Sequence, residues 1–259
     1  MRKTLALIRK ELLVFFTTPT AYAALAIFVI LSSFFFLRLL GSFQARVEQT
    51  TRKAPELLQY LNLTDGVLEP LYLQIAVIFI FVMPFLSMRL FAEERRLKTY
   101  ELLLVHPISI PVIALGKYLA ALVVLLAMVG LSLAYPCLLA AYADLGRPSW
   151  NTVACGLLGL TLCGAAFLAV GMFLSSLTQS QALAAAVTFC VLLLLWVVGW
   201  AAADQLGTSR EVLLALSAID HVRGFIRGAI ELSDVVYFLS LIGLGVFFTC
   251  QSLELQRIG

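Results

Sequence analysis

Few residues in this chain could do chemistry, and those few lie far apart in the sequence. His106 and His221 fall in different predicted loops, so neither a haem site nor a zinc site is predicted. The pair Gly116-Lys117 lacks the first glycine and the following Ser or Thr of a phosphate-binding loop. The cysteines lie in or beside apolar segments, where a thiol is inert, and they predict no disulfide framework: Cys137, Cys155, Cys163, Cys190 and Cys250. The sequence therefore predicts no catalytic, cofactor-binding or metal-binding residue, and we do not expect an enzyme.

One polar stretch, residues 89–117, carries more charge than a connecting turn requires. Glu94 stands four residues before Lys98, the helical spacing at which opposite charges stabilise a helix. Leucines follow this charged half, and Pro107 and Pro111 then turn the chain. Two interpretations remain open. The stretch is either a solvated extension of the preceding helix or a docking helix, with apolar anchors that fit a groove on a partner and charges that set the register.

A second polar stretch runs from residue 204 to residue 234. It contains a short amphipathic segment, 212–216, followed by a segment in which Phe225 and Ile226 alternate with cations. We predict that this segment is either an ordinary surface loop or one that enters the lipid head groups. Gly224 and Gly228 have the spacing of a helix-packing pair, but outside a clear membrane span we expect them to serve as turn and cap.

The elements that position these stretches follow from composition. Apolar residues make up 62% of the 259 residues and charged residues only 13%, against roughly 45–50% and 25% in soluble domains. This composition excludes a soluble enzyme, a disordered tail and a nucleic-acid-binding domain, and the net charge of +3 is too small and scattered for a polyanionic partner. Long gaps between charges predict an all-α membrane protein with six spans, at about residues 21–40, 71–91, 112–138, 152–174, 182–203 and 235–251.

The ends of the chain are predicted on one side of the membrane, because six spans return it to its starting side. That side carries more Lys and Arg near the spans, which predicts cytoplasmic termini. Residues 1–19 are expected to form an amphipathic interfacial arm rather than a secretory signal, and Pro19 ends it. No ionisable residue is expected at depth, which argues against an ion-coupled carrier.

Small residues recur inside the fourth span at steps of four or eight: Cys155, Gly159, Cys163, Gly171 and Ser175. Small side chains let helix backbones approach closely, so we interpret this stripe as a packing surface rather than a pore lining. The polar run 175–181 that follows is predicted to be a short turn at one membrane face.

The first polar stretch resembles the signature of ABC-2 type transporter permeases, roughly E-x-x-x-G-T-x-E-x-L-L-x-x-P followed by an apolar helix that opens with G-K. The matching residues are Glu94, Thr99, Glu101, Leu103, Leu104, Pro107, Gly116 and Lys117. Lys98 stands where the family has glycine. The second stretch is similar to a segment of the gliding-motility-associated branch, and there the matching residues are His221, Phe225, Arg227, Gly228, Asp234, Val235, Tyr237 and Phe238.

This resemblance implies one permease domain over residues 1–259, with the fold of the ABC-2, or type V, exporters. The chain would be the membrane subunit of an ATP-driven exporter, with ATP and Mg bound on a separate ATPase present in two copies. Its partners would be a second permease copy, or a related subunit with an extracytoplasmic domain, in the inner membrane of a bacterium. The resemblance places the ATPase-docking surface at Arg9, Lys10, Glu11, Glu93, Glu94, Lys98, Thr99, Glu101, Leu103, Leu104 and Pro107. It places an extracytoplasmic gate at His221, Phe225, Arg227, Gly228 and Asp234.

Two other function classes fit parts of the sequence. A noncatalytic membrane scaffold would use the charged stretch 89–117 to recruit a cytoplasmic partner without transport. A membrane-embedded enzyme, such as a lipid transferase, is disfavoured by the shortage of clustered polar side chains. The residues do not predict the transported substrate.

Overall fold

The computed structural model describes residues 19–53, 56, 62–96, 109–142, 148–201 and 208–258. In these ranges every regular element is helical. The longer elements are α2 (Pro19–Lys53), α3 (Glu69–Ser87), α6 (Ile110–Ser132), α8 (Trp150–Leu177), α9 (Gln181–Ala201) and α12 (Leu232–Ile258). The shorter ones are η2 (Thr64–Leu68), α4 (Ala92–Arg96), α7 (Ala134–Tyr142), α10 (Thr208–Leu216) and α11 (Ala218–Ile226).

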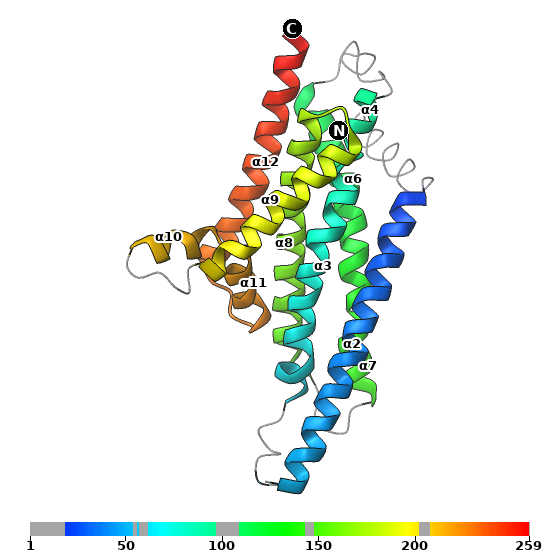
Figure 1. Ribbon diagram of the computed structural model, residues 1–259, viewed down its shortest axis with the longest axis vertical. Helices are drawn as coiled ribbons and strands as arrows, with labels where there is room; N and C mark the ends of the chain where they lie inside the picture. The colour runs from blue at the N-terminus through cyan, green and yellow to red at the C-terminus, as the bar shows by residue number, and fades with distance from the viewer. Residues whose placement is uncertain are drawn as a thin grey trace.

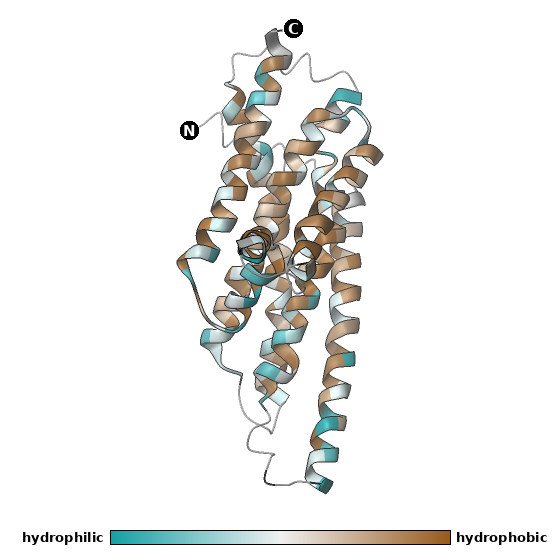
Figure 2. Ribbon diagram, turned by 60° about the vertical axis from the view of Figure 1, so that its left-hand side comes forward, coloured by the Kyte–Doolittle hydropathy of each residue, from teal (hydrophilic) through white to brown (hydrophobic). Residues whose placement is uncertain are grey.

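The long helices run up and down an elongated bundle (Figure 1). We call one end of it the α4 end, where α3 gives way to α4, α8 turns into α9, and α12 finishes. The opposite end, where α2 finishes and α7 lies, is the α7 end. Helix α2 begins and α12 finishes toward the α4 end, as an even number of spans requires. Figure 2 shows hydrophobic residues through the middle of the bundle and hydrophilic residues gathered toward its ends.

The six predicted spans are confirmed. Six helical segments of the described chain are long and apolar enough to cross a membrane: 21–53, 64–87, 110–142, 150–177, 181–201 and 232–255. The third span is formed by α6 and α7 together. Pro136, which lacks a backbone N–H, lies near the break between these two helices.

Helix α2 extends well beyond its predicted end at residue 40. It continues to Lys53, so Arg46 and Arg52 lie on a helix where a long loop was expected. The extension is rich in residues with good helix propensity, and Glu48 accepts a hydrogen bond of 2.6 Å from Arg52, one turn later. The first extramembrane connection is therefore partly a rigid rod.

Helix α8 occupies the centre of the bundle and packs against α3, α6, α9, α11 and α12. Its glycines allow the neighbouring helices to approach closely, because a side chain from one of those helices packs against each glycine. A Cβ atom added to Gly156 would lie 2.7 Å from the ring of Tyr72 on α3, and one added to Gly164 would lie 2.5 Å from Leu125 on α6. A Cβ atom at Gly159 would overlap Phe225 on α11, and one at Gly171 would overlap Ser87 on α3. The packing interpretation of the small-residue stripe is confirmed at Gly159 and Gly171.

The second polar stretch departs from its prediction. It folds into α10 and α11, and α11 buries Ile219, Val222, Phe225 and Ile226 rather than presenting them to water or lipid head groups. The lengths of the neighbouring helices explain this burial. Helix α9 has 21 residues and α8 has 28. The difference of seven residues is about 10 Å of helix, and α11 packs in the space beside α8 that α9 does not cover.

Candidate functional site

The first candidate site is the elbow between α3 and α4, which we define as residues 88–96. A single buried hydroxyl holds it to α8. The Oγ atom of Ser175 accepts hydrogen bonds from the backbone N–H groups of Phe91 (3.3 Å) and Ala92 (3.2 Å). It donates to the carbonyl oxygen of Met88 at 3.0 Å. These N–H groups stand at the start of α4, where a helix has no partners of its own for them, so Ser175 supplies the missing acceptor from another helix.

An ion pair braces the same elbow from its outer side. The Nε and Nη2 atoms of Arg89 donate to Oε2 and Oε1 of Glu93, both at 2.6 Å. The two side chains are 16% and 30% exposed, so the pair is only partly screened by water. Two parallel hydrogen bonds fix direction as well as distance. The brace therefore makes the end of α3 and the first turn of α4 one unit.

A buried lysine completes the elbow. Lys117 on α6 is 2% exposed, and its Nζ atom stands 5.4 Å from the ring centroid of Phe91, within cation–π range. Lys117 lies in the segment 110–142, which is long and apolar enough to cross a membrane, and protein surrounds its side chain. Lys117 lies in the first third of α6, where its aliphatic stem is covered by protein. The elbow is thus attached to α6 and α8 as well as to α3.

Most of the predicted ATPase-docking residues cannot be placed. Glu93 lies in the elbow, and Glu94 belongs to α4. The other predicted docking residues lie outside the described residues: Arg9, Lys10, Glu11, Lys98, Thr99, Glu101, Leu103, Leu104 and Pro107. Sequence reasoning missed Arg89 and the capping role of Ser175. The spacing of Arg89 and Glu93 was a readable signal, whereas nothing local connects Ser175 to a helix more than 80 residues earlier.

The second candidate site joins α10, α11 and α12. The Nδ1 atom of His221 lies 2.7 Å from Oδ1 of Asp234, and its Nε2 atom lies 3.3 Å from the carbonyl oxygen of Ala215. The carboxylate of Asp234 only accepts hydrogen bonds, so the Nδ1 atom of His221 is the donor in the shorter contact. This bond joins α11 to the start of α12. The ring also stacks on Tyr237 at 4.1 Å, and the Tyr237 hydroxyl donates to the carbonyl oxygen of Leu216 at 2.9 Å.

The other predicted gate residues surround this latch, which we define as His221, Asp234 and Tyr237. Phe225 fills the notch at Gly159 and lies 6.3 Å from the ring of Phe238. Arg227 reaches in the other direction, with its Nε atom 3.1 Å from Oε1 of Glu69 at the start of α3. Gly228 ends α11 with φ of 82°, a left-handed conformation that glycine adopts without strain, so its predicted capping role is confirmed.

Gly224 lies inside α11, and its role differs from the predicted turn. A Cβ atom there would lie 2.6 Å from Oδ2 of Asp234. The missing side chain therefore lets Asp234 approach α11 closely enough to reach His221. The structure brings His221, Phe225 and Asp234 together in one buried cluster, while Arg227 and Gly228 anchor the far end of α11.

The latch predicts strong coupling between two residues 13 positions apart. We expect His221→Ala to lower the free energy of unfolding by about 1–3 kcal/mol, because it leaves the buried Asp234 carboxylate without its hydrogen-bond partner. The double variant with Asp234→Ala should cost less than the sum of the single variants, by about 0.5–3 kcal/mol. Unfolding in mild detergent, followed by circular dichroism, measures the cycle. Arg223→Ala is the control, because its pair with Asp220 is surface-exposed and should contribute no more than about 1 kcal/mol. Strictly additive changes would contradict the latch.

Among the described residues, no three His, Cys, Asp or Glu side chains are grouped closely enough to hold a metal ion. The two sites share one structural property: in each, a few directional contacts connect three or more helices.

Comparison with known families identifies the chain. The model of the ABC-2 family transporter proteins matches residues 5–210, well over half of the 259 residues. The match covers α2 to α9 and ends inside α10, so α11 and α12 lie beyond it. A search of curated proteins gave no match. With six membrane helices of the expected order, this protein belongs to the ABC-2 family of transporter proteins and is a multi-pass permease component of an ABC transporter.

Proposed function

We propose that this permease is the membrane subunit of an ATP-driven exporter in which a separate ATPase docks at the α4 end and moves the elbow. Two ATPase copies bind and hydrolyse ATP with Mg. The permease contributes no catalytic group and converts the motion of the elbow into rearrangement of the membrane helices.

The observation that carries this proposal is the construction of the elbow. Residues 88–96 are held to α8 through Ser175 and to α6 through the contact of Lys117 with Phe91. A force applied to α4 therefore acts on α3, α6 and α8 at once. Well-packed helices move as rigid bodies rather than deforming continuously, so such a push favours a concerted rearrangement.

The elbow also presents charge to a partner. Glu93, Arg95 and Arg96 follow one another in α4, and Arg96 is exposed. The predicted docking residues that follow in the chain, including Glu101, lie outside the described residues and are assigned to docking by the resemblance alone. Charges of both signs on one surface set the register and the rate of association of two proteins.

The second site supplies a counterpart on the opposite side. Helix α11 connects to α8 at Gly159, to α3 through the pair of Arg227 with Glu69, and to α12 through the latch. Movement of α3 and α8 relative to α12 must either break some of these contacts or move α11 as well. We propose that α11 acts in this way as the extracytoplasmic gate.

The remaining assignments follow from the sequence. The excess of Lys and Arg near the α4 end favours a cytoplasmic location for both termini and insertion in a bacterial inner membrane. Similarity over residues 221–238 favours the gliding-motility-associated branch. In that branch the partner is a second copy of this permease or a related membrane subunit with an extracytoplasmic domain.

Co-purification in mild detergent tests the proposal. We expect an ABC ATPase to be recovered with the permease, and its turnover in proteoliposomes to change when the permease is present. Glu94→Lys and Glu101→Lys should reduce both recovery and the change in turnover. Glu211→Lys, an exposed charge on α10, is the matched control and should leave both unaffected.

Two results would count against the proposal. An ATPase that binds but keeps the same turnover would favour a scaffold. If Glu94→Lys and Glu101→Lys both recover as much ATPase as the unchanged permease, residues 94–101 do not form the docking surface.

A further inference from the structure

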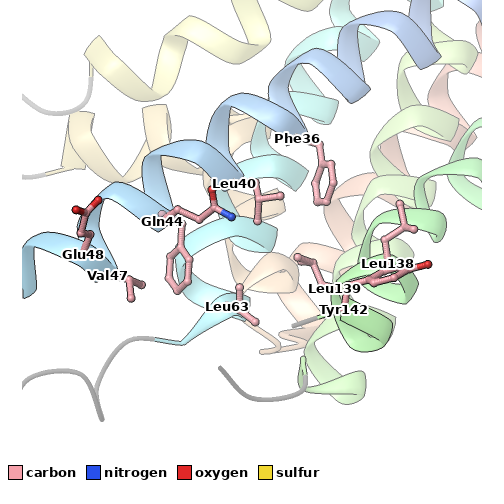
Figure 3. A pocket seen from close by; sticks show the side chains of 10 residues that line it. Phe36, Leu40, Gln44, Val47, Glu48, Leu63, Leu138, Leu139 and Tyr142 are labelled. Carbon is pink, nitrogen blue, oxygen red and sulfur yellow. The ribbon is translucent and has the colours of Figure 1, made fainter. Parts of the chain in front are cut away.

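We infer that a pocket between α2 and α7 binds the acyl chain of a phospholipid from the leaflet at the α7 end. The pocket has a volume of about 510 Å³, within the range of roughly 300–1,000 Å³ usual for small-molecule sites. It lies away from both the elbow and the latch. Figure 3 shows side chains from α2, from Leu63 and from α7 arranged around one space.

One stripe of α2 forms the longest wall. Its lining residues fall at positions 36, 40, 43, 44, 47 and 48, which recur with the spacing of a single helix face. From Phe36 to Glu48 this wall extends over twelve residues, or about 18 Å. Leu138 and Leu139 on α7 face it. The space is therefore an elongated slot, which suits a linear chain better than a compact ring.

The inner end of the slot is closed by hydrogen bonds. The hydroxyl of Tyr135 on α7 lies 2.6 Å from Oγ of Ser32 and 3.2 Å from Oγ of Ser33, both on α2. The ring of Tyr135 stands 4.9 Å from that of Phe36. These contacts hold α2 and α7 together at the inner end, next to Phe36.

A second set of contacts builds the wall around Leu63. Phe43 packs into the notch left by Gly66, where an added Cβ atom would lie 2.5 Å from its ring. The Nη2 atom of Arg46 donates to the carbonyl oxygen of Gly66 at 3.2 Å. Both contacts fix η2 against α2. The contacts between α2 and α7 and those between α2 and η2 thus form two walls of the slot.

The polarity of the slot identifies its occupant. Phe36 and Leu40 lie within the span predicted from the sequence, whereas Gln44 and Glu48 lie one and two turns beyond it. An apolar inner part and a polar outer part, at the level where α2 leaves the hydrocarbon, match the acyl chain and head group of a lipid. Tyr142 lines the outer part and is 84% exposed, as are the aromatic residues that anchor proteins at the membrane surface.

The head group is expected to be a phosphodiester. Arg46 and Arg52 are both exposed on α2 beside the outer part of the slot, and the side chain of Arg52 is 75% exposed. Guanidinium groups bind phosphate through paired hydrogen bonds. A phospholipid whose chain occupies the slot would bring its phosphate within reach of these side chains.

Photolabelling in nanodiscs tests this inference without any ATPase. The probe is a phospholipid with a diazirine near the end of one acyl chain, and labelled sites are mapped by mass spectrometry. We expect labelling to concentrate around Phe36 and Leu139. Leu139→Trp and Leu40→Trp should fill the slot and lower that labelling about tenfold, equivalent to roughly 1.4 kcal/mol. Leu37→Trp is the matched control, because Leu37 is 65% exposed on α2 and does not line the slot.

Competition identifies the head group. An unlabelled phospholipid should displace the probe better than a diacylglycerol with the same chains. Equal competition by the two would remove the role of the phosphate. Labelling spread evenly over all lipid-facing helices, or equal labelling of Leu40→Trp and Leu37→Trp, would overturn the inference.

Discussion

Replacing Gly245 by leucine is expected to prevent α12 from packing against α8. A Cβ atom at position 245 would lie 2.7 Å from both the carbonyl carbon and the carbonyl oxygen of Ala169. Because these are backbone atoms in the middle of α8, they cannot rotate away as a flexible side chain can. We expect a loss of at least about 3 kcal/mol of stability, the upper end of the usual cost of overpacking.

The same helix provides the control. Gly243 lies two residues earlier, is exposed, and has nothing within 4 Å of an added Cβ atom. Gly243→Leu should therefore give the same folded yield and the same unfolding curve in detergent as the unchanged protein, and Gly245→Leu should give neither. Similar behaviour of the two variants would show that α8 and α12 do not approach as closely as described.

Reversing one charge of the elbow brace is expected to uncouple the permease from its ATPase. In Arg89→Glu or Glu93→Arg, two like charges face each other in place of a pair of hydrogen bonds of 2.6 Å. The elbow should then lose its fixed direction, and coupled ATP turnover in proteoliposomes should fall by about tenfold or more. Insertion and unfolding in detergent should change much less, because the pair lies at the surface of the bundle.

The double reversal separates two roles of Glu93. If the carboxylate acts only as an internal brace, Arg89→Glu combined with Glu93→Arg should restore most of the coupling. If Glu93 contacts the ATPase directly, the double variant should remain uncoupled, which contradicts the brace. Glu211→Lys, which reverses an exposed charge on α10, is the control and should leave turnover unchanged.

The sequence predicted the membrane helices well because their signal is local. Five stretches without charge are long enough to cross a bilayer. Four of them became one span each, and the longest, residues 148–203, became two. The absence of charge does not predict where a helix ends when the helix continues beyond its apolar part. Arg38 led to a predicted end of the first span at residue 40, but the helix continues to Lys53, since arginine favours helical structure in water.

Helix α11 was harder to predict, although its pattern was readable. Its buried residues, 218, 219, 222, 225 and 226, follow the period of an amphipathic helix, and Ser217 caps its start. With nine residues and several charges, the segment resembles a surface element. Only the length of α9 relative to α8, which sequence alone does not reveal accurately, explains why its apolar face is covered by protein.

The candidate sites depend on contacts between distant parts of the chain. The cap from Ser175 to Phe91 and the latch from His221 to Asp234 each join different helices. No spacing rule within one element predicts them, because they depend on how far neighbouring helices are shifted along their axes. Sequence reasoning could nominate His221 and Asp234 by resemblance to a family, but not their contact.

The 35 residues of α2 span about 52 Å, against a hydrocarbon thickness of about 30 Å. About 20 Å of this helix therefore stands outside the bilayer core, with no proline after Pro19 to bend it. Such a rod acts as a lever: a tilt too small to detect where α2 contacts α3 becomes a sideways sweep of several ångströms at Lys53. A fluorophore attached near Lys53 would therefore report motion of the buried bundle.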